Sequence, residues 1–301
     1  MLRILTSSHT RNRLFTQTSL PNNIALNEKI FLVVTDKGGT FVDKGCNIPH
    51  RAFDAVLKKH GVHLSSKQIR KPMGKSKDIH LKELMNLPQF QKQWHRKPSQ
   101  QDFETLYADY NQLQNELLQN VDLIPFAEET IKTLQQHQVP LAFTTGFPSA
   151  TTRIVLNKVA ASLGHPKVVI SADQVSDKSR GSMVEEALIQ YKISSKNYER
   201  VVFLSDSHND IHDVSRRYPE IQRIGITGYS VLLNIDNFDQ VPTQILNQKR
   251  QKAAEILTKA GAHKIIIYLH ELPSMLYQIG NELDQRGVLS QRILAFPARR
   301  I

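Results

Sequence analysis

Short apolar runs alternate with amphipathic helical segments along most of this sequence, and this alternation limits the possible folds more than any other feature. Continuous runs rich in β-branched residues predict buried strands. Six such runs occur, within residues 30–35, 139–146, 167–175, 200–205, 221–228 and 263–272. Strands that alternate with helices favour a parallel sheet with right-handed crossovers. The sequence therefore predicts an α/β fold with a Rossmann-like parallel-sheet core.

A block of helical segments interrupts this alternation after the first strand. Residues 48–60 carry apolar side chains at helical spacing, and Gly61 follows as a stop signal. The segments from there to about residue 121 are also helical, and roughly 75 residues are too many for a loop. We therefore expect an N-terminal extension at 1–28, a core formed by 29–45 and 123–301, and an inserted α-helical cap domain at 46–122.

The net charge of +11 raises the question of a nucleic-acid partner. The basic residues are scattered, and neither an aromatic-interleaved RNA motif nor zinc-finger spacing is present. We interpret the charge as a surface that attracts an anionic small molecule, and we expect no nucleic-acid partner. We also expect no membrane span, because no apolar run approaches about 18 residues.

Localisation signals are weak. One cysteine, Cys46, excludes an internal disulfide and is typical of a reducing compartment. We expect a cytoplasmic protein. Residues 1–27 contain three arginines and no acid, as in a mitochondrial transit peptide, so a mitochondrial location is the alternative.

Polar residues follow four of the predicted strands at the point where each strand ends. They are Asp36, then Thr144, Thr145 and Gly146, then Lys178, and finally Asp206 with Asp210. The carboxyl ends of parallel strands meet at one edge of a sheet, where open α/β proteins bind ligands. Carboxylates, a hydroxyl and a cation in one place suit phosphoryl transfer assisted by Mg²⁺.

The order of these groups resembles the haloacid dehalogenase superfamily, whose first loop reads Asp-x-Asp-x-Thr. Here the loop reads Asp36-Lys37-Gly38-Gly39-Thr40, so the second acid is missing. In phosphatases of that superfamily this acid protonates the leaving oxygen, and such proton transfer contributes roughly 10²–10⁴ in rate. The chain is therefore either inactive or acts on a leaving group other than oxygen. A carbon leaving group needs an electron sink, and a lysine imine supplies one.

The predicted cap offers such a lysine in the stretch RKPMGKSKDIH, residues 70–80. Lys77 and His80 are three residues apart and share a face of a helix. Neighbouring cations and partial burial both lower the pKa of a lysine. From composition alone, a solvated basic turn remains the alternative.

Together with this stretch, FLVVTDKGGTFVDKGC, residues 31–46, resembles the phosphonoacetaldehyde hydrolase (phosphonatase) branch of the superfamily. The resemblance continues through TTGF, SDSHND and GAH, and it covers residues from about 29 to 284. That branch carries a small residue at the position of Gly38. The resemblance implies hydrolysis of the carbon–phosphorus bond of phosphonoacetaldehyde and a homodimer that pairs through the cap.

The resemblance also implies a role for each matching residue. It makes Asp36 the nucleophile, Lys77 the imine-forming amine, and His80 the group that shuttles protons. It makes Asp36, the carbonyl of Gly38 and Asp206 the Mg²⁺ ligands, supported by Asp210. It implies substrate contacts from Thr145, Gly146 and Lys178, and a pocket shaped by Cys46 and Met73.

Four positions depart from the branch. Phe147 stands where tyrosine is usual, Lys37 where tryptophan is usual, and Ser205 where glycine precedes the metal aspartate. Lys178 matches the expected arginine after a one-residue deletion, and Arg180 is the alternative. Two other functions stay open: a phosphomonoesterase of the same superfamily, and a catalytically inactive, basic binding module.

Overall fold

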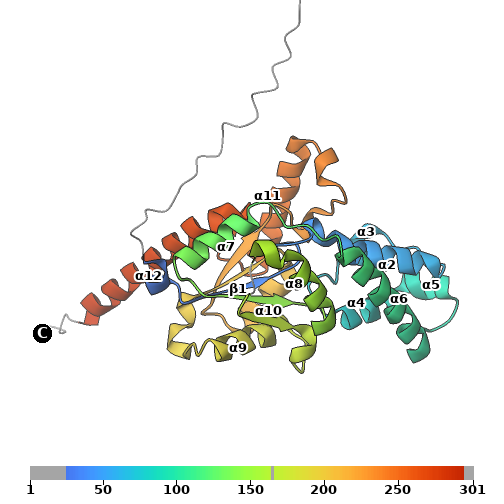
Figure 1. The fold of residues 1–301 in the computed structure, drawn as a ribbon, viewed down its shortest axis with the longest axis horizontal. Coiled ribbons are helices and arrows are strands. Elements are labelled where there is room, and N and C mark those ends of the chain that lie inside the picture. Colours follow the sequence, from blue (N-terminus) through green and yellow to red (C-terminus); the bar gives the residue numbers. More distant parts are fainter. Residues whose placement is uncertain (1–24, 164–165, 295–301) are drawn as a thin grey trace, which may run out of the picture.

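A computed structural model describes residues 25–163 and 166–294 and contains one six-stranded parallel sheet in the order β3-β2-β1-β4-β5-β6 (Figure 1). The strands are β1 Leu32–Asp36, β2 Leu141–Thr145, β3 Val168–Ser171, β4 Val201–Ser205, β5 Gln222–Ile226 and β6 Lys264–Ile266. The helices are α1 Leu26–Lys29, α2 Asn47–Lys59, α3 Ser66–Arg70, α4 Lys77–Met85, α5 Pro88–Trp94, α6 Gln100–Leu118, α7 Ala127–Gln136, α8 Ser149–Leu163, α9 Arg180–Gln190, α10 His208–Arg217, α11 Thr243–Lys259 and α12 Leu272–Leu294. The predicted Rossmann-like α/β fold is confirmed.

Helices cover both faces of this sheet. Side chains of α7, α8 and α12 form one hydrophobic cluster with one face, and side chains of α9, α10 and α11 form a second cluster with the other. Figure 1 shows α7 and α12 on one side of β1 and α9 and α10 on the opposite side. Burial on both faces is the reason that the strands read as continuous apolar runs rather than as alternating patterns.

The last strand is shorter than its apolar run. β6 ends at Ile266, although the run continues to residue 272. The backbone amides of Ile267 and Tyr268 both donate to the side chain of Glu271, at 3.1 and 2.7 Å. These amides are therefore turned away from the sheet, and a helical turn follows.

The helices α2 to α6 lie together beside the sheet (Figure 1) and have a hydrophobic cluster of their own. Phe53, Leu84, Phe90, Leu106 and Tyr110 are among its members, and each is at most 1% exposed. A cluster of this size is what a small inserted domain requires. We retain residues 46–122 as the proposed cap domain on this basis.

The order of the strands decides where polar groups gather. β1 lies between β2 and β4, so the direction of winding reverses between β1 and β4. Ligands bind outside the carboxyl ends of the strands at such a point. Thr35 pairs with Leu204, which brings Asp36 and Asp206 to the same edge of the sheet.

Most of the expected N-terminal extension lies outside the described residues, but its end does not. Leu26 is fully buried in the core, and Lys29 forms an ion pair of 2.6 Å with Asp284 of α12. The core therefore begins before residue 29. In the described part of the chain, no helix combines the length and apolar character needed to span a bilayer.

The separate cluster leads to a stability prediction. We expect Leu106→Ala to destabilise helices α2–α6 by about 2–5 kcal/mol, because it leaves a cavity among buried neighbours. Hydrogen exchange measured by mass spectrometry should show faster exchange in residues 47–118 and unchanged exchange in β1, β2 and β4. Equal acceleration in both regions would contradict an independently folding cap.

Candidate active site

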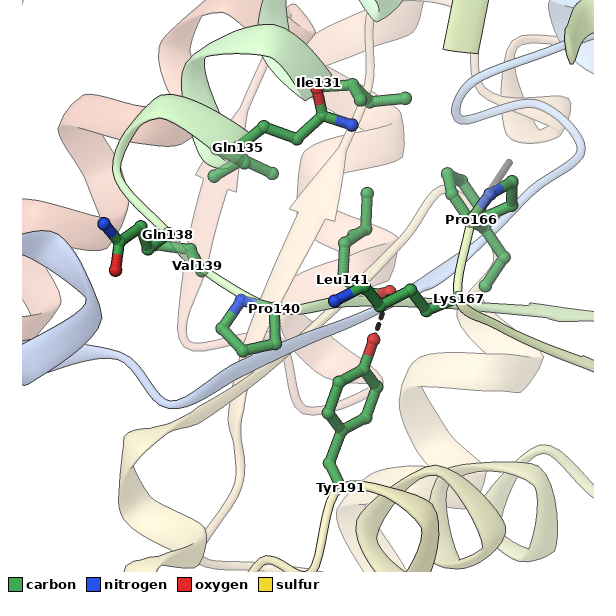
Figure 2. Close-up of a pocket in the computed structure, with 11 residues that line it drawn as sticks. Ile131, Gln135, Gln138, Val139, Pro140, Leu141, Pro166, Lys167 and Tyr191 are labelled. Atoms are coloured by element: carbon green, nitrogen blue, oxygen red, sulfur yellow. Dashed lines mark hydrogen bonds between the residues drawn. The ribbon is translucent and has the colours of Figure 1, made fainter. Parts of the chain in front are cut away.

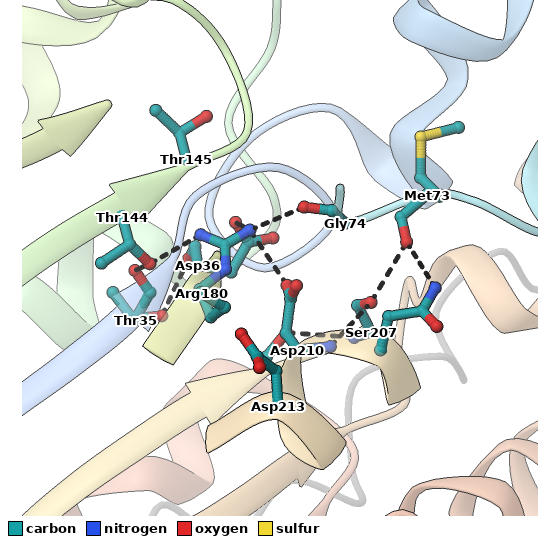
Figure 3. Close-up of polar contacts among 12 residues, drawn as sticks. Thr35, Asp36, Met73, Gly74, Thr144, Thr145, Arg180, Ser207, Asp210 and Asp213 are labelled. Carbon is teal, nitrogen blue, oxygen red and sulfur yellow. Dashed lines mark hydrogen bonds and ion pairs between the residues drawn. The ribbon is translucent and has the colours of Figure 1, made fainter. Parts of the chain in front are cut away.

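Asp36 is the last residue of β1 and points into a buried polar cluster at the carboxyl edge of the sheet (Figure 3). The chain then turns through Gly39, whose φ of +75° lies in the left-handed region that favours glycine. A Cβ on Gly39 would lie 2.3 Å from Oδ2 of Asp206. The glycine-rich turn therefore lets the Asp206 carboxylate approach the backbone that follows Asp36.

Arg180, the first residue of α9, is the buried cation of this cluster (Figure 3). Its Nη2 lies 3.0 Å from Oδ1 of Asp36 and 3.0 Å from Oδ2 of Asp210. Its Nη1 donates to Oγ1 of Thr144 at 2.7 Å. An arginine keeps its charge when buried, so it can neutralise carboxylates that have no access to water.

Lys178 lies outside this cluster, in contrast to its expected place at the substrate. Its Nζ forms an ion pair of 2.6 Å with Asp78 of α4, and its side chain is 39% exposed. The loop turns at Lys178, where φ is +54°, so that residues 178 and 180 point to different partners. The alternative residue, Arg180, occupies the position beside Asp36.

Burial raises the pKa of two carboxylates in the cluster, and one oxygen of Asp206 has no hydrogen-bond partner among the described residues. Burial and the charge of Asp36 raise the pKa of Asp206 well above its ordinary value. Oδ2 of Asp206 accepts a hydrogen bond of 2.7 Å from the amide of Val231, but Oδ1 has no partner among the described residues. Burial also raises the pKa of Asp36 to about 6, although Arg180 opposes the shift.

Oδ1 of Asp206 has no hydrogen-bond partner among the described residues, and a second buried carboxylate, Asp36, lies at the same edge of the sheet. Such a pair of carboxylates fits a hard divalent cation. Across residues 25–163 and 166–294, no three His, Cys, Asp or Glu side chains form a complete metal cage. Mg²⁺ does not require one, because it commonly keeps several waters and binds through one or two carboxylates. Asp36, Asp206 and the carbonyl of Gly38 could therefore hold Mg²⁺.

The segment between α3 and α4, residues 71–76, contacts this edge of the sheet through its backbone. A Cβ on Gly146 would lie 2.6 Å from the carbonyl of Lys75, and one on Gly74 would lie 2.5 Å from Oγ of Ser207. Nη2 of Arg180 donates to the carbonyl of Gly74 at 3.2 Å. Only residues without side chains at these two positions permit so close an approach.

Lys77 begins α4 directly after this segment and is 5% exposed. Its Nζ lies 3.8 Å from Sδ of Met73 and 5.3 Å from the ring centroid of Phe147. Burial lowers the pKa of Lys77, and the charge of Asp36 partly opposes this shift. A larger fraction of Lys77 therefore carries the neutral amine at neutral pH than in an ordinary lysine.

His80 lies one turn further along α4 and is fully buried. Its Nε2 lies 2.7 Å from the carbonyl of Ile69, and because a carbonyl only accepts, Nε2 carries the proton. Nδ1 has no partner among the described residues. Burial, with Lys77 as the next cause, holds the pKa of His80 well below its ordinary value, so the ring is neutral and Nδ1 is an unprotonated hydrogen-bond acceptor.

A small cavity of about 30 Å³ lies between Asp36, Lys77 and Arg180. It is lined by Asp36, Gly38, Val42, Asp43, Cys46, Pro49, Met73, Gly74, Lys77, Leu118, Thr145, Gly146, Phe147 and Arg180. The predicted nucleophile and the predicted amine thus line one cavity, together with five other predicted site residues. His80, Lys178 and Asp206 are outside the lining.

Asp43 lines the cavity although sequence reasoning did not single it out. Its carboxylate accepts a hydrogen bond of 3.1 Å from the amide of Ile48, and burial raises its pKa to about 7. Asp43 lies within the stretch of residues 31–46 that carries the family resemblance, but the resemblance gave it no role, and no periodicity predicts which side of a turn it faces. The backbone of Asp43 is left-handed, with φ of +57°, and this was not visible in the sequence.

Lys37 is a second buried amine, next to Asp36 in the chain. It is 1% exposed, and its Nζ lies 5.4 Å from the ring centroid of Phe147 and has no hydrogen-bond partner among the described residues. Burial lowers its pKa to about 7. Lys37 does not line the cavity, so it has no assigned part in the chemistry.

A larger cavity, about 410 Å³, lies at the amino end of β2 (Figure 2). Of its lining residues, Lys167 and Tyr191 carry ionisable side chains, and the Tyr191 hydroxyl donates to the carbonyl of Leu141 at 3.0 Å. A cavity with two ionisable side chains and no carboxylate in its lining lacks the set of reactive groups found at the opposite edge, despite its greater volume.

The family model described as haloacid dehalogenase-like hydrolase matches residues 36–216, more than half of the chain. The chain therefore belongs to the haloacid dehalogenase-like hydrolases, and the predicted superfamily is confirmed.

Several curated relatives are named phosphonoacetaldehyde hydrolase, and two of them illustrate the similarity. The protein of Lysinibacillus sphaericus is 26% identical over 85% of this chain and 97% of its own length. The protein of Lactiplantibacillus plantarum is 26% identical over 82% of this chain and 95% of its own. Among solved structures, a phosphonoacetaldehyde hydrolase-like protein from Oleispira antarctica has a TM-score of 0.79 at 18% identity, and the match covers 89% of this chain and 98% of that one. The predicted resemblance is thus confirmed.

The isolated amine of Lys37 leads to a prediction about stability and pH. Its folded-state pKa of about 7 lies below the ordinary 10.5. Between these pH values the unfolded chain binds a proton that the folded chain does not, so the cost of burying Lys37 falls as the pH rises. We expect Lys37→Met to raise the free energy of unfolding at pH 6 by about 1–4 kcal/mol.

Urea unfolding at pH 6, 7.5 and 9 measures this difference, with the exposed Lys92→Met as control. The advantage of Lys37→Met should shrink steadily toward pH 9. A constant advantage, or a loss of stability at pH 6, would show that the buried amine is not the cause.

Proposed function

We propose that this hydrolase cleaves the carbon–phosphorus bond of phosphonoacetaldehyde and releases acetaldehyde and phosphate. The observation that carries the proposal is that the amine of Lys77, from α4, and the carboxylate of Asp36, from β1, line one cavity. The names of the curated relatives support the same reaction.

The first step is formation of an imine at Lys77. The neutral amine attacks the aldehyde carbon, one proton is taken up from solvent, the carbonyl oxygen leaves as water, and a protonated imine remains. The lowered pKa of Lys77 supplies the neutral amine. Nδ1 of His80, which has no partner in the described structure, is available to accept a proton during this step.

The second step is transfer of the phosphoryl group. One carboxylate oxygen of Asp36 attacks phosphorus, the carbon–phosphorus bond breaks, and its electron pair moves into the imine to give a neutral enamine. Arg180, at 3.0 Å from Asp36, offsets the charge of the phosphoryl oxygens. Thr145 and Gly146 line the same cavity, which supports their assignment as contacts of those oxygens.

The last steps regenerate the enzyme. The enamine takes up a proton at carbon, and water hydrolyses the resulting imine to acetaldehyde and free Lys77. A second water hydrolyses the aspartyl phosphate to phosphate and free Asp36. Met73, Cys46 and Phe147 line the same cavity, and we propose that they surround the two-carbon fragment and limit the access of bulk water.

We propose Mg²⁺ as the cofactor, held by Asp36, Asp206 and the carbonyl of Gly38. When bound, it supplies positive charge that offsets the charge of the phosphoryl group. The partnerless Oδ1 of Asp206 supports this choice. Asp210, which accepts from Arg180 and from Oγ of Ser205 at 3.2 Å, steadies the neighbouring side chains.

The glycine at position 38 favours a substrate whose leaving group is carbon over a phosphate ester, whose leaving group is oxygen. A Cβ at Gly38 would meet only Sγ of Cys46, at an ordinary 3.6 Å, and its φ is outside the left-handed region. Sterics therefore do not force a glycine where phosphatases carry their acid. An enamine needs no proton from that position as it departs, so the acid is dispensable.

The amine makes a direct test possible. We expect borohydride with phosphonoacetaldehyde to attach a two-carbon adduct to Lys77, located by peptide mass spectrometry. Lys77→Arg keeps the charge but forms no imine, so phosphate release should fall by several orders of magnitude, about 10⁴-fold. Wild-type protein that releases no phosphate with Mg²⁺ present, and gives no adduct, would refute the proposal and favour an inactive binding module.

The open space at Gly38 gives a second test. We expect Gly38→Asp to hydrolyse an aryl phosphate ester about 10²-fold faster than Gly38→Ala, because it restores a general acid. Gly38→Ala should retain cleavage of phosphonoacetaldehyde. Rapid ester hydrolysis by the wild-type protein would instead favour the phosphomonoesterase alternative.

A further inference from the structure

We propose that Lys178 is a positioning residue whose ion pair with Asp78 holds the start of α4 against the core, so that Lys77 stays in the cavity with Asp36. The inference rests on the proposed function for the importance of Lys77. It gives Lys178 a role that differs from the substrate contact expected from the sequence.

The ion pair joins the two elements that carry the reactive groups. Asp78 directly follows Lys77 on α4, and Lys178 precedes Arg180 by two residues. The distance of 2.6 Å from Nζ of Lys178 to Oδ2 of Asp78 links residues 100 positions apart. A shift of this contact would therefore move the amine of Lys77 relative to the cluster of Asp36 and Arg180.

The pair completes a series of contacts that fix residues 71–76 to the core. Before this segment, Nη2 of Arg70 lies 2.7 Å from Asp236. Within it, Nδ2 of Asn209 donates to the carbonyl of Met73 at 2.9 Å. After it, the Lys178–Asp78 pair holds the first turn of α4. The segment is thus restrained at both ends and in its centre.

The backbone at Lys178 adopts a left-handed conformation, which turns the chain between Lys178 and Arg180. Its φ of +54° is uncommon for a residue other than glycine or asparagine. Ser179 follows Lys178 and caps α9, which begins at Arg180. The chain therefore changes direction immediately before the helix. The turn directs the amine of Lys178 toward α4 while Arg180 points into the cluster.

The side chain of Lys178 is 39% exposed and that of Asp78 is 19% exposed. An ion pair exposed to this degree contributes little to global stability. Reaction rates respond more strongly to position, because a displacement of about 1 Å can cost up to 10²-fold. A positioning role therefore predicts a large kinetic effect without a matching loss of thermal stability. A merely structural role instead predicts a loss of thermal stability with little change in the reaction rate.

The test compares Lys178→Met and Asp78→Asn with Glu83→Gln, a matched control. Glu83 forms an ion pair of the same 2.6 Å length with Lys75, but both partners lie within residues 46–122. The first readout is the rate at which formaldehyde and borohydride methylate Lys77, followed by peptide mass spectrometry. It does not depend on the natural substrate.

We expect methylation of Lys77 to be about 5- to 10-fold faster in Lys178→Met and Asp78→Asn, and unchanged in Glu83→Gln. With phosphonoacetaldehyde, kcat should fall about 10-fold in the first two variants at an unchanged melting temperature. The double variant should be no worse than either single one. Lys178→Arg keeps the positive charge and should therefore show the slow methylation of Lys77 and the kcat of the wild-type protein.

Methylation rates equal to that of Glu83→Gln in both variants would overturn the inference, as would additive losses in the double variant. If the wild-type protein releases no phosphate from phosphonoacetaldehyde, the proposed function fails, and the methylation rates still decide the role of Lys178. If Lys178→Met does not fold, Asp78→Asn and Lys178→Arg decide it in the same way.

Discussion

The buried guanidinium of Arg180, shared between Asp36 and Asp210, is the interaction on which the rest of the site depends. A carboxylate inside a protein is costly unless it is paired, and three carboxylates gather at this edge of the sheet. One permanently charged group neutralises two of them, at 3.0 Å each, and also donates to Thr144. Thr144 in turn donates to the carbonyl of Thr35 at 3.0 Å, which ties the cation to the ends of β1 and β2. The third carboxylate, Asp206, remains short of positive charge, and this is the electrostatic reason for expecting a divalent cation there.

The contact between residues 71–76 and the sheet depends on the same group. Arg180 donates to the carbonyl of Gly74, so the side chain that neutralises Asp36 also fixes the segment that leads into Lys77. The two glycines, Gly74 and Gly146, leave room for backbone to meet backbone and side chain at this boundary. The result is that an amine from a helix and a carboxylate from a strand share one desolvated cavity. Burial lowers the pKa of the amine and raises that of the carboxylate, and opposite charge only partly corrects either shift.

Much of this site could be predicted from the sequence because its residues follow strands. Asp36, Thr145 and Gly146 come at the ends of apolar runs, and a parallel sheet places all such ends together. The position of Lys178 could not be predicted in this way. It and Arg180 lie in an irregular loop, where no periodicity indicates which of two nearby cations turns inward. Asp43 was missed for a similar reason, since its left-handed backbone sets its direction and has no signature in the sequence. The sequence marked Lys37 as a departure from the usual tryptophan, and only its 1% exposure shows that it is isolated from water.

The sequence by itself determined the fold class, the inserted helical block and the presence of an aspartate at the end of the first strand without a second acid two residues later, because all three depend on local periodicity or on residue order. The tertiary structure decided which cation reaches Asp36, and it brought the amine of Lys77 into the same cavity. It also set the pKa shifts of both groups. These properties depend on burial and on distances between residues far apart in the chain, and neither quantity is encoded in any single segment.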